Sequence, residues 1–142
     1  ELLISLSKDS NTQAVLVRGK VEDGRDEQIL PNLRLIGHLH EKALTQLIKN
    51  SKGLICRSGY STLMDLAALG KKAVLIPTPG QPEQLYLANL WHDQYGWPVR
   101  FQSELDTLPS SQILETAKEL PYSSAKDQMA NCMKERLAKW FS

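Results

Sequence analysis

Short apolar runs alternate with longer helical patterns along this chain, and this alternation restricts its fold more than any other feature. The apolar runs show no polar–apolar alternation, so they suit strands that are covered on both faces. They are AVLVRG (14–19), LRLIG (33–37), GLIC (53–56), AVLIP (73–77) and, more weakly, PVRF (98–101). Helical patterns occupy 41–50, 60–69, 82–95, 108–120 and 124–140. Strands that alternate with helices predict an α/β fold with a parallel sheet, right-handed crossovers and helices on both faces.

Local signals set some of the expected boundaries. The second helical stretch should stop at Gly70, and the third should begin at Pro82 and stop at Gly96. The second stretch places three apolar side chains on one face: Leu63, Leu66 and Ala67. The polar segment 18–32 is expected to be a mobile loop between the first two strands.

The composition is that of an ordinary globular domain. The chain has 142 residues, of which 42% are hydrophobic and 23% charged. A net charge of +1 gives no electrostatic case for a nucleic acid or membrane partner. The two cysteines, Cys56 and Cys132, have no metal-ligand spacing, and Cys56 is expected to be a small core residue. This cysteine usage favours a reducing compartment, most simply the cytoplasm.

The joint after the third apolar run reads CRSGYSTLMDLAALG (56–70). In open α/β sheets, ligands bind beyond the carboxyl ends of the strands. A helix that starts there offers free N–H groups and a partial positive charge, to which phosphate often binds. Gly59 would let a ligand approach the backbone closely. Four side chains at the joint can donate hydrogen bonds: Arg57, Ser58, Ser61 and Thr62.

A carboxylate follows one to two turns later. Asp65 lies about 9 Å beyond Gly59 along a helix that rises ~1.5 Å per residue. It is too far to oppose a phosphate there but can accept hydrogen bonds from ribose hydroxyls. Phosphate and ribose together predict a nucleotide site. Taken singly, these residues also allow plainer interpretations: Ser58 as an N-cap, Asp65 as a solvated helix residue and Arg57 as a surface charge.

The next joint reads TPGQPEQLYLAN (78–89). Proline and glycine make this loop rigid and local. Glu83 and Gln84 would stand in the first turn of the following helix, at the same sheet edge, where they could hold sugar hydroxyls. The alternative is that Glu83 only complements the dipole of that helix.

With both joints in view, the stretch 33–89 resembles the C-terminal, donor-binding domain of GT-B glycosyltransferases. The closest likeness is to bacterial peptidoglycan N-acetylglucosaminyltransferases, which attach GlcNAc to a lipid-linked muramyl precursor. Those enzymes have a Cys-Arg-Ser-Gly joint, an acidic residue six positions after the glycine, and a proline loop with polar residues. The resemblance implies a Rossmann-like C-terminal half of a GT-B fold, with UDP-GlcNAc as the expected donor of a hexosyl group in the full-length enzyme.

Carried over residue by residue, the resemblance implies a donor site built from helix starts and loops: Leu39, Arg57, Ser58, Gly59, Ser61, Thr62, Asp65, Glu83 and Gln84. Within it, the helix start would hold the diphosphate and Asp65 would replace the family's ribose-binding glutamate. Glu83 and Gln84 match residues that grip the sugar, and the backbone at Leu39 would read uracil. No catalytic residue is assigned to this chain, and neither a metal nor another cofactor is expected.

The chain departs from the family pattern in several places. Asp65 is one methylene shorter than glutamate, and Leu85 follows Gln84 where the closest relatives have paired glutamines, which leaves the sugar open. The family's first strand, its Gly-rich phosphate loop and its acceptor domain have no counterpart here. We therefore expect a fragment of a longer protein, with the missing strand between those at 14–19 and 53–56. The acceptor domain would be its partner and the route to any peripheral membrane association.

Two other functions stay open. A UDP-GlcNAc epimerase or UDP-sugar hydrolase on the same fold would need carboxylates and histidines in its cleft, and the histidines are His38, His40 and His92. A non-catalytic partner domain could keep the fold without a ligand. Failure of the full-length protein to bind any nucleotide would favour the latter.

Overall fold

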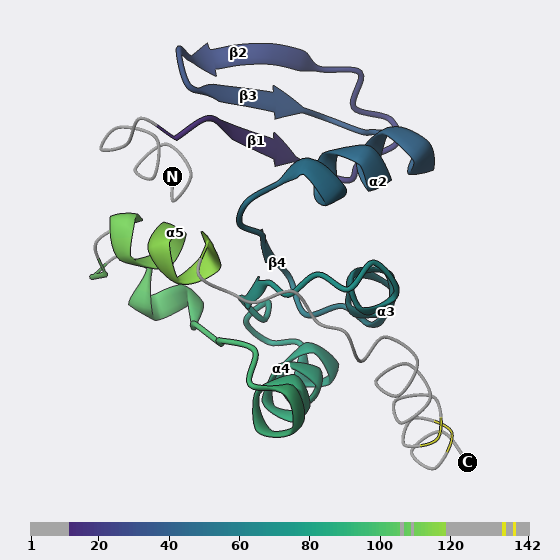
Figure 1. Ribbon diagram of the computed structural model, residues 1–142, viewed down its shortest axis with the longest axis vertical. Helices are drawn as coiled ribbons and strands as arrows, with labels where there is room; N and C mark the ends of the chain where they lie inside the picture. The colour runs from purple at the N-terminus through teal and green to yellow at the C-terminus, as the bar shows by residue number, and fades with distance from the viewer. Residues whose placement is uncertain (1–11, 106, 109, 119–134, 136–137, 139–142) are drawn as a thin grey trace.

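The computed structural model describes residues 12–105, 107, 108, 110–118, 135 and 138. Its elements are β1 (Ala14–Val17), β2 (Asp26–Leu30), β3 (Leu33–Ile36), α2 (Glu41–Asn50), β4 (Ile55–Cys56), α3 (Tyr60–Ala68), β5 (Val74–Leu75), α4 (Pro82–Tyr95), the short 3-10 helix η1 (Gln102–Glu104) and α5 (Ser110–Lys118). Figure 1 shows a three-stranded sheet at one end of the molecule and α3, α4 and α5 grouped around β4 at the other.

The expected strands and helices are largely confirmed. Each of the four apolar runs contains a strand, and the weaker fifth run contributes a single bridge between Val99 and Leu75. Helices α2 and α4 have the expected bounds, and α4 ends at Gly96 in the left-handed conformation (φ 68°). The predicted helix at 124–140 lies outside the described residues apart from 135 and 138.

The described strands form two sheets. The order is β1-β3-β2 in one and β4-β5 in the other. The pairs β1–β3 and β4–β5 are parallel, as expected, whereas β2 joins β3 in antiparallel orientation. The parallel pairing of β4 with β5 brings the two joints singled out in the sequence to the same sheet edge.

The prediction of a mobile loop over 18–32 is wrong, because residues Asp26–Leu30 form β2. This strand is almost entirely exposed and carries charged side chains, which an edge strand tolerates because it faces water. Asp26 accepts two hydrogen bonds from the guanidinium of Arg34, at 2.7 and 2.6 Å. The preceding residues are held too: the Gly37 N–H donates to the Arg25 carbonyl at 2.8 Å.

Strands β1 and β4 lie in separate sheets. Among the described residues, no strand pairs with both of them to join the two sheets. Ala14 N–H donates to Asn32 and Arg18 N–H donates to Ile36, so alternate residues of β1 bond to β3. The backbone groups of the residues between them face the other way. The strand expected in this interval stays a prediction.

The core lies around β5, whose side chains alternate between two faces. Leu75 belongs to the larger cluster, formed by α3, α4 and their flanks: Leu63, Leu66, Ala67, Ala73, Leu75, Leu87, Ala88, Leu90, Trp91 and Trp97. On the opposite face, Val74 and Ile76 pack with Leu105, Ile113 and Ala117. The predicted buried stripe of α3 is confirmed, and a strand covered on both faces is what its unbroken apolar run indicated.

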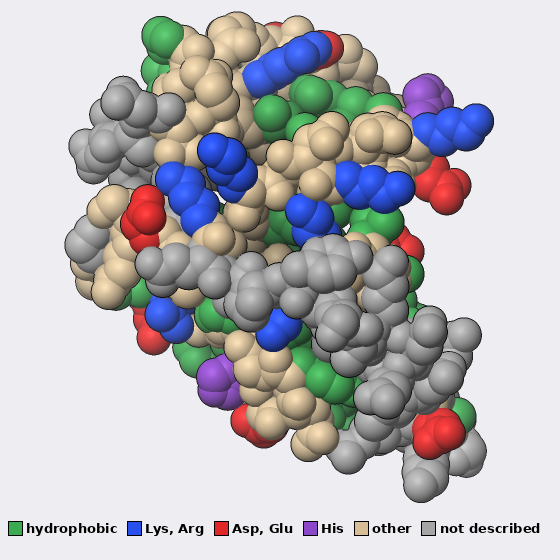
Figure 2. All heavy atoms as spheres, in the orientation of Figure 1, with side chains coloured by type: hydrophobic (Ala, Val, Ile, Leu, Met, Phe, Trp, Pro, Cys, Tyr) green, Lys and Arg blue, Asp and Glu red, His purple; other side chains and the backbone are tan. Residues whose placement is uncertain are grey.

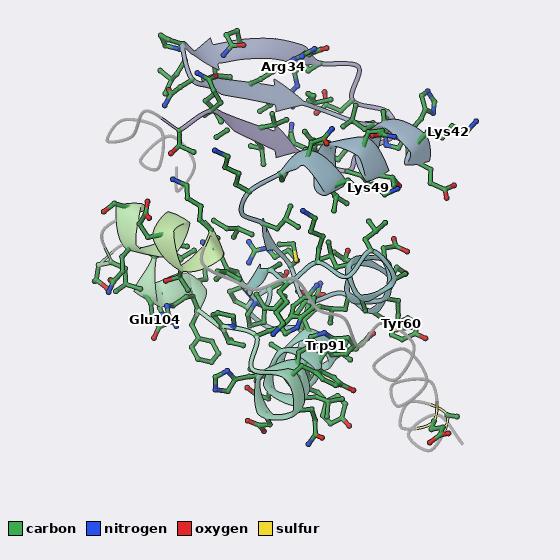
Figure 3. The ribbon with its side chains drawn as sticks, in the orientation of Figure 1. Arg34, Lys42, Lys49, Tyr60, Trp91 and Glu104 are labelled. Atoms are coloured by element: carbon green, nitrogen blue, oxygen red, sulfur yellow. The ribbon has the colours of Figure 1, made fainter. Side chains whose placement is uncertain are left out.

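Trp91 and Trp97 are the largest side chains of this core, and both are fully buried. Their rings meet edge to face, with centroids 6.0 Å apart and an interplanar angle of 78°. Figure 3 shows Trp91 between α3 and α4. In the part of the chain that the structure describes, no helix combines the length and the apolar character needed to cross a bilayer.

Candidate functional site

The starts of α3 and α4 follow the carboxyl ends of the paired strands β4 and β5. In α3, the first intrahelical hydrogen bond runs from the Leu63 N–H to the Gly59 carbonyl at 3.0 Å. The N–H groups of Tyr60, Ser61 and Thr62 precede that bond and have no acceptor within the helix. No side chain of a described residue caps this end, and its first turn contains no acidic residue. The start of α3 therefore retains its donors and its partial positive charge.

Gly59 is the N-cap of α3, with φ −75° and ψ 145°, a conformation that any residue adopts. A Cβ atom at this position would meet no heavy atom within 4 Å. Among the described residues, neither the backbone nor the packing requires glycine here. The interpretation of Ser58 as the N-cap is therefore wrong.

The loop before α4 is a tight turn, as its proline and glycine predicted. The Gln81 N–H donates to the Thr78 carbonyl at 3.2 Å, and Gly80 has φ 78°. Pro79 followed by a glycine at positive φ is the signature of a type II turn. Helix α4 then begins at Pro82 without a side-chain cap, and Glu83 stands in its first turn.

Four of the nine predicted site residues present exposed side chains with no hydrogen bond or ion pair to the described residues: Ser61, Thr62, Asp65 and Glu83. Ser61 and Asp65 are separated by one helical turn and so share a face of α3. Leu39 is half-buried in the loop after β3. Among the described residues, nothing occupies the hydrogen-bonding groups of Ser61, Thr62, Asp65 and Glu83.

The other three predicted side chains are bonded within the protein. The Ser58 hydroxyl donates to the Gln84 carbonyl at 2.7 Å. The Gln84 side-chain oxygen accepts from the Thr78 N–H at 2.9 Å. Arg57 donates to the Gln102 side chain at 2.9 Å and to carbonyl oxygens at the end of β5.

Sequence reasoning missed two glutamines at this edge. Gln81 accepts from the Gln84 side chain at 2.9 Å, and Gln102 accepts from Arg57. A signal for Gln81 existed, because a polar residue directly before a helix-starting proline occupies the N-cap position. Gln102 lies 45 residues from Arg57, so only the tertiary fold brings the two side chains within hydrogen-bonding distance.

The three histidines and Cys56 contact or are buried by other parts of the protein. The rings of His38 and His40 meet edge to face at 5.7 Å, and His92 Nδ1 lies 2.9 Å from the Trp97 carbonyl oxygen. Burial raises the pKa of the Cys56 thiol to about 12, so the thiol stays protonated at neutral pH. Among the residues that can be described, no group of three or more His, Cys, Asp or Glu could hold a metal ion.

The profile of the glycosyltransferase family 28 C-terminal domain matches residues 4–139. The chain belongs to this family. No curated protein and no solved structure adds a further match. The family 28 match spans both joints, and it identifies the chain as a Rossmann-like, donor-binding domain of a glycosyltransferase. The expected α/β fold class is thereby confirmed.

Proposed function

We propose that this family 28 domain binds a UDP-sugar, with UDP-GlcNAc as the preferred candidate, and supplies the donor half of a hexosyltransferase. The observation that carries the proposal is the start of α3, which no described side chain caps and where a Cβ atom on Gly59 would meet no heavy atom within 4 Å in the described part of the chain. A helix start that is neither capped nor covered can bind an anion at little cost, because its N–H groups already need an acceptor.

The donor diphosphate would bind at this helix start. The N–H groups of Tyr60, Ser61 and Thr62 point along the helix axis toward that position. The exposed Ser61 and Thr62 hydroxyls can add hydrogen bonds. We expect these groups, rather than a bound metal, to balance the charge of the diphosphate.

The rest of the nucleotide sugar would extend from this anchor in two directions. Asp65 is exposed and has no partner among the described residues, so its carboxylate can accept from both ribose hydroxyls. The backbone near Leu39 would meet the uracil. Glu83, exposed at the start of α4, would accept from sugar hydroxyls.

In the reaction, the bond between the anomeric carbon and the β-phosphate oxygen breaks, and the electron pair stays on that oxygen. The positive end of α3 would stabilise this developing charge, which lowers the barrier if the stabilisation is greater in the transition state than in the bound donor. The acceptor nucleophile would lose its proton to a base in an N-terminal acceptor domain.

An NMR titration tests the proposal. UDP should shift the amide signals of residues 57–65 and 83–84 together in the complete domain, because both loops line one sheet edge. Uridine should shift fewer of the signals at the α3 start, and CDP should bind more weakly if the base is read. Shifts confined to α5, or no shifts at all, would contradict the assignment.

A further inference from the structure

Ser58 is the buried polar residue in the described part of the chain, with an exposed fraction of 0%. Its hydroxyl donates to the Gln84 carbonyl at 2.7 Å, across 26 positions of sequence. A fully buried hydroxyl cannot touch a ligand. Instead, this hydrogen bond joins the loop before α3 to the first turn of α4.

Gln84 continues the connection with its side chain. Its oxygen accepts from the Thr78 N–H at 2.9 Å, and its amide nitrogen donates to the Gln81 side chain at 2.9 Å. The first turn of α4 is thus bonded to Ser58 on one side and to both ends of its own preceding turn on the other.

Arg57 makes a third link from the same loop. Its Nη1 donates to the carbonyl oxygens of Ile76 (3.1 Å) and Pro77 (3.4 Å), and its Nη2 donates to the Gln102 side chain at 2.9 Å. Two adjacent residues therefore tie the loop after β4 to the end of β5, to η1 and to α4.

We infer that Arg57, Ser58 and Gln84, here called the loop brace, are positioning residues that fix the start of α3 relative to the start of α4. The inference rests on the proposed function, because it is the nucleotide sugar that would bridge the two helix starts. It divides seven of the nine candidates into side chains that meet the ligand and side chains that hold the two helix starts in place. Ser61, Thr62, Asp65 and Glu83 belong to the first set.

The physical need for such a brace follows from geometry. Hydrogen bonds to a diphosphate weaken steeply when the donors turn away. The sugar attached to that diphosphate has a fixed length, so the groups that bind it must lie at a fixed distance from the groups that bind the diphosphate. Two loops that moved independently would have to be ordered on binding, at a cost in affinity. Internal bonds that order them beforehand remove that cost.

Hydrogen exchange of the ligand-free protein tests the brace directly. In Ser58→Ala, the amide of Leu63, which donates to the Gly59 carbonyl, and the amides of Thr78 and Gln81 should exchange about fivefold faster together, the factor expected for one lost hydrogen bond. Ser61→Ala is the matched control, because it removes an exposed hydroxyl from the adjacent first turn of α3, and exchange of the same amides should be unchanged. Unchanged exchange in Ser58→Ala, or faster exchange at Leu63 alone or at Thr78 and Gln81 alone, would overturn the inference.

Gln84 provides a second test should Ser58→Ala fail to fold. Gln84→Glu keeps the acceptor for the Thr78 N–H, whereas Gln84→Met loses it. Gln84→Met should weaken UDP and UDP-GlcNAc by the same factor in calorimetric titrations and should loosen the 78–84 amides, whereas Gln84→Glu should retain the protection of Thr78. A loss confined to UDP-GlcNAc, with unchanged exchange, would mean that Gln84 contacts the sugar instead.

The two experiments distinguish the two proposals. If the wild-type protein binds neither UDP nor UDP-GlcNAc, the proposed function fails, while the exchange data still decide whether the brace exists. If the wild-type protein binds UDP and Ser58→Ala binds it equally well with unchanged exchange, the brace fails and the proposed function stands.

Discussion

Residues 12–50 and residues 51–118 are held together by different forces. Three of the four ion pairs between described residues lie in the first region: Arg18–Asp23, Arg25–Asp23 and Arg34–Asp26. All buried members of the two hydrophobic clusters lie between Leu63 and Ala117, in the second. Figure 2 shows lysine and arginine side chains over the three-stranded sheet and α2, with hydrophobic side chains exposed among them.

The two regions also differ in where the predicted donor-site residues lie. The second region has an aromatic core beneath β5, and it carries eight of the nine predicted donor-site residues at the edge of that core. The first region contributes Leu39; it buries Leu33, Leu35 and Ile36 of β3 outside the two clusters, and backbone pairing and ion pairs add to this. The proposed donor site lies beside the densely packed region, where close-packed side chains resist deformation.

The largest effect is expected in the core of the second region. Trp91→Ala removes a side chain with 0% exposure and should lower the free energy of unfolding by about 3–5 kcal/mol. Val15→Ala, at a position of β1 that is 40% exposed, should cost less than about 1 kcal/mol. Denaturant titrations followed by circular dichroism measure both. Equal losses of stability would mean that β1 is as buried in solution as α4, which would contradict the difference between the two regions.

A smaller effect is expected where the loop after β1 lies on the end of β3. A Cβ atom on Gly37 would clash with the Asp23 carbonyl oxygen, so Gly37→Ala must displace that loop. The expected loss is about 1–3 kcal/mol. Gly24→Ala is the control, because a Cβ there meets nothing within 4 Å and should change stability by no more than ~0.5 kcal/mol. Equal stability of the two variants would support the prediction from the sequence that residues 18–32 form a mobile loop.

A substitution in the second region should weaken ligand binding without lowering the stability of the protein. Asp65→Ala should weaken UDP binding by roughly 1–3 kcal/mol, the scale for losing hydrogen bonds to a charged group. The melting temperature should barely change, since Asp65 is exposed. In the unmutated protein, a 2′,3′-dideoxy analogue of UDP should bind correspondingly more weakly. Equal affinity for the two nucleotides would show that Asp65 does not read ribose.

The smallest effect concerns acid stability in the first region. Hydrogen bonding by Arg34 holds the pKa of Asp26 below its usual 3.8. The carboxylate therefore contributes stability above about pH 4, and this contribution is lost as the pH falls through the lowered pKa. Because the pair is on the surface, the change should be small and should shrink further in high salt.

Melting curves between pH 2 and pH 5 provide the measurement. Asp26→Asn should flatten part of the acid decline, whereas Glu27→Gln, at the next position of β2, should retain it. An identical decline in Asp26→Asn and the wild type would assign the acid sensitivity to other groups.

The sequence predicted the second region well because its signals are local. Unbroken apolar runs marked β4 and β5, and Pro82 and Gly96 marked the ends of α4 to the residue. The first region was predicted less well, because β2 has neither an apolar run nor a period of two. The pair Pro31-Asn32 between β2 and β3 was a turn signal that could have revealed the hairpin.

The sequence by itself determined which residues surround the site, because helix starts, strand ends and turns follow from spacing along the chain. The tertiary structure decided which of those side chains are buried and which are exposed. Ser58 and Ser61 have the same hydroxyl and stand three positions apart, yet one is buried against Gln84 and the other is exposed. Their difference arises from the packing of α4 against the loop before α3, a contact between segments 26 positions apart that no local pattern encodes.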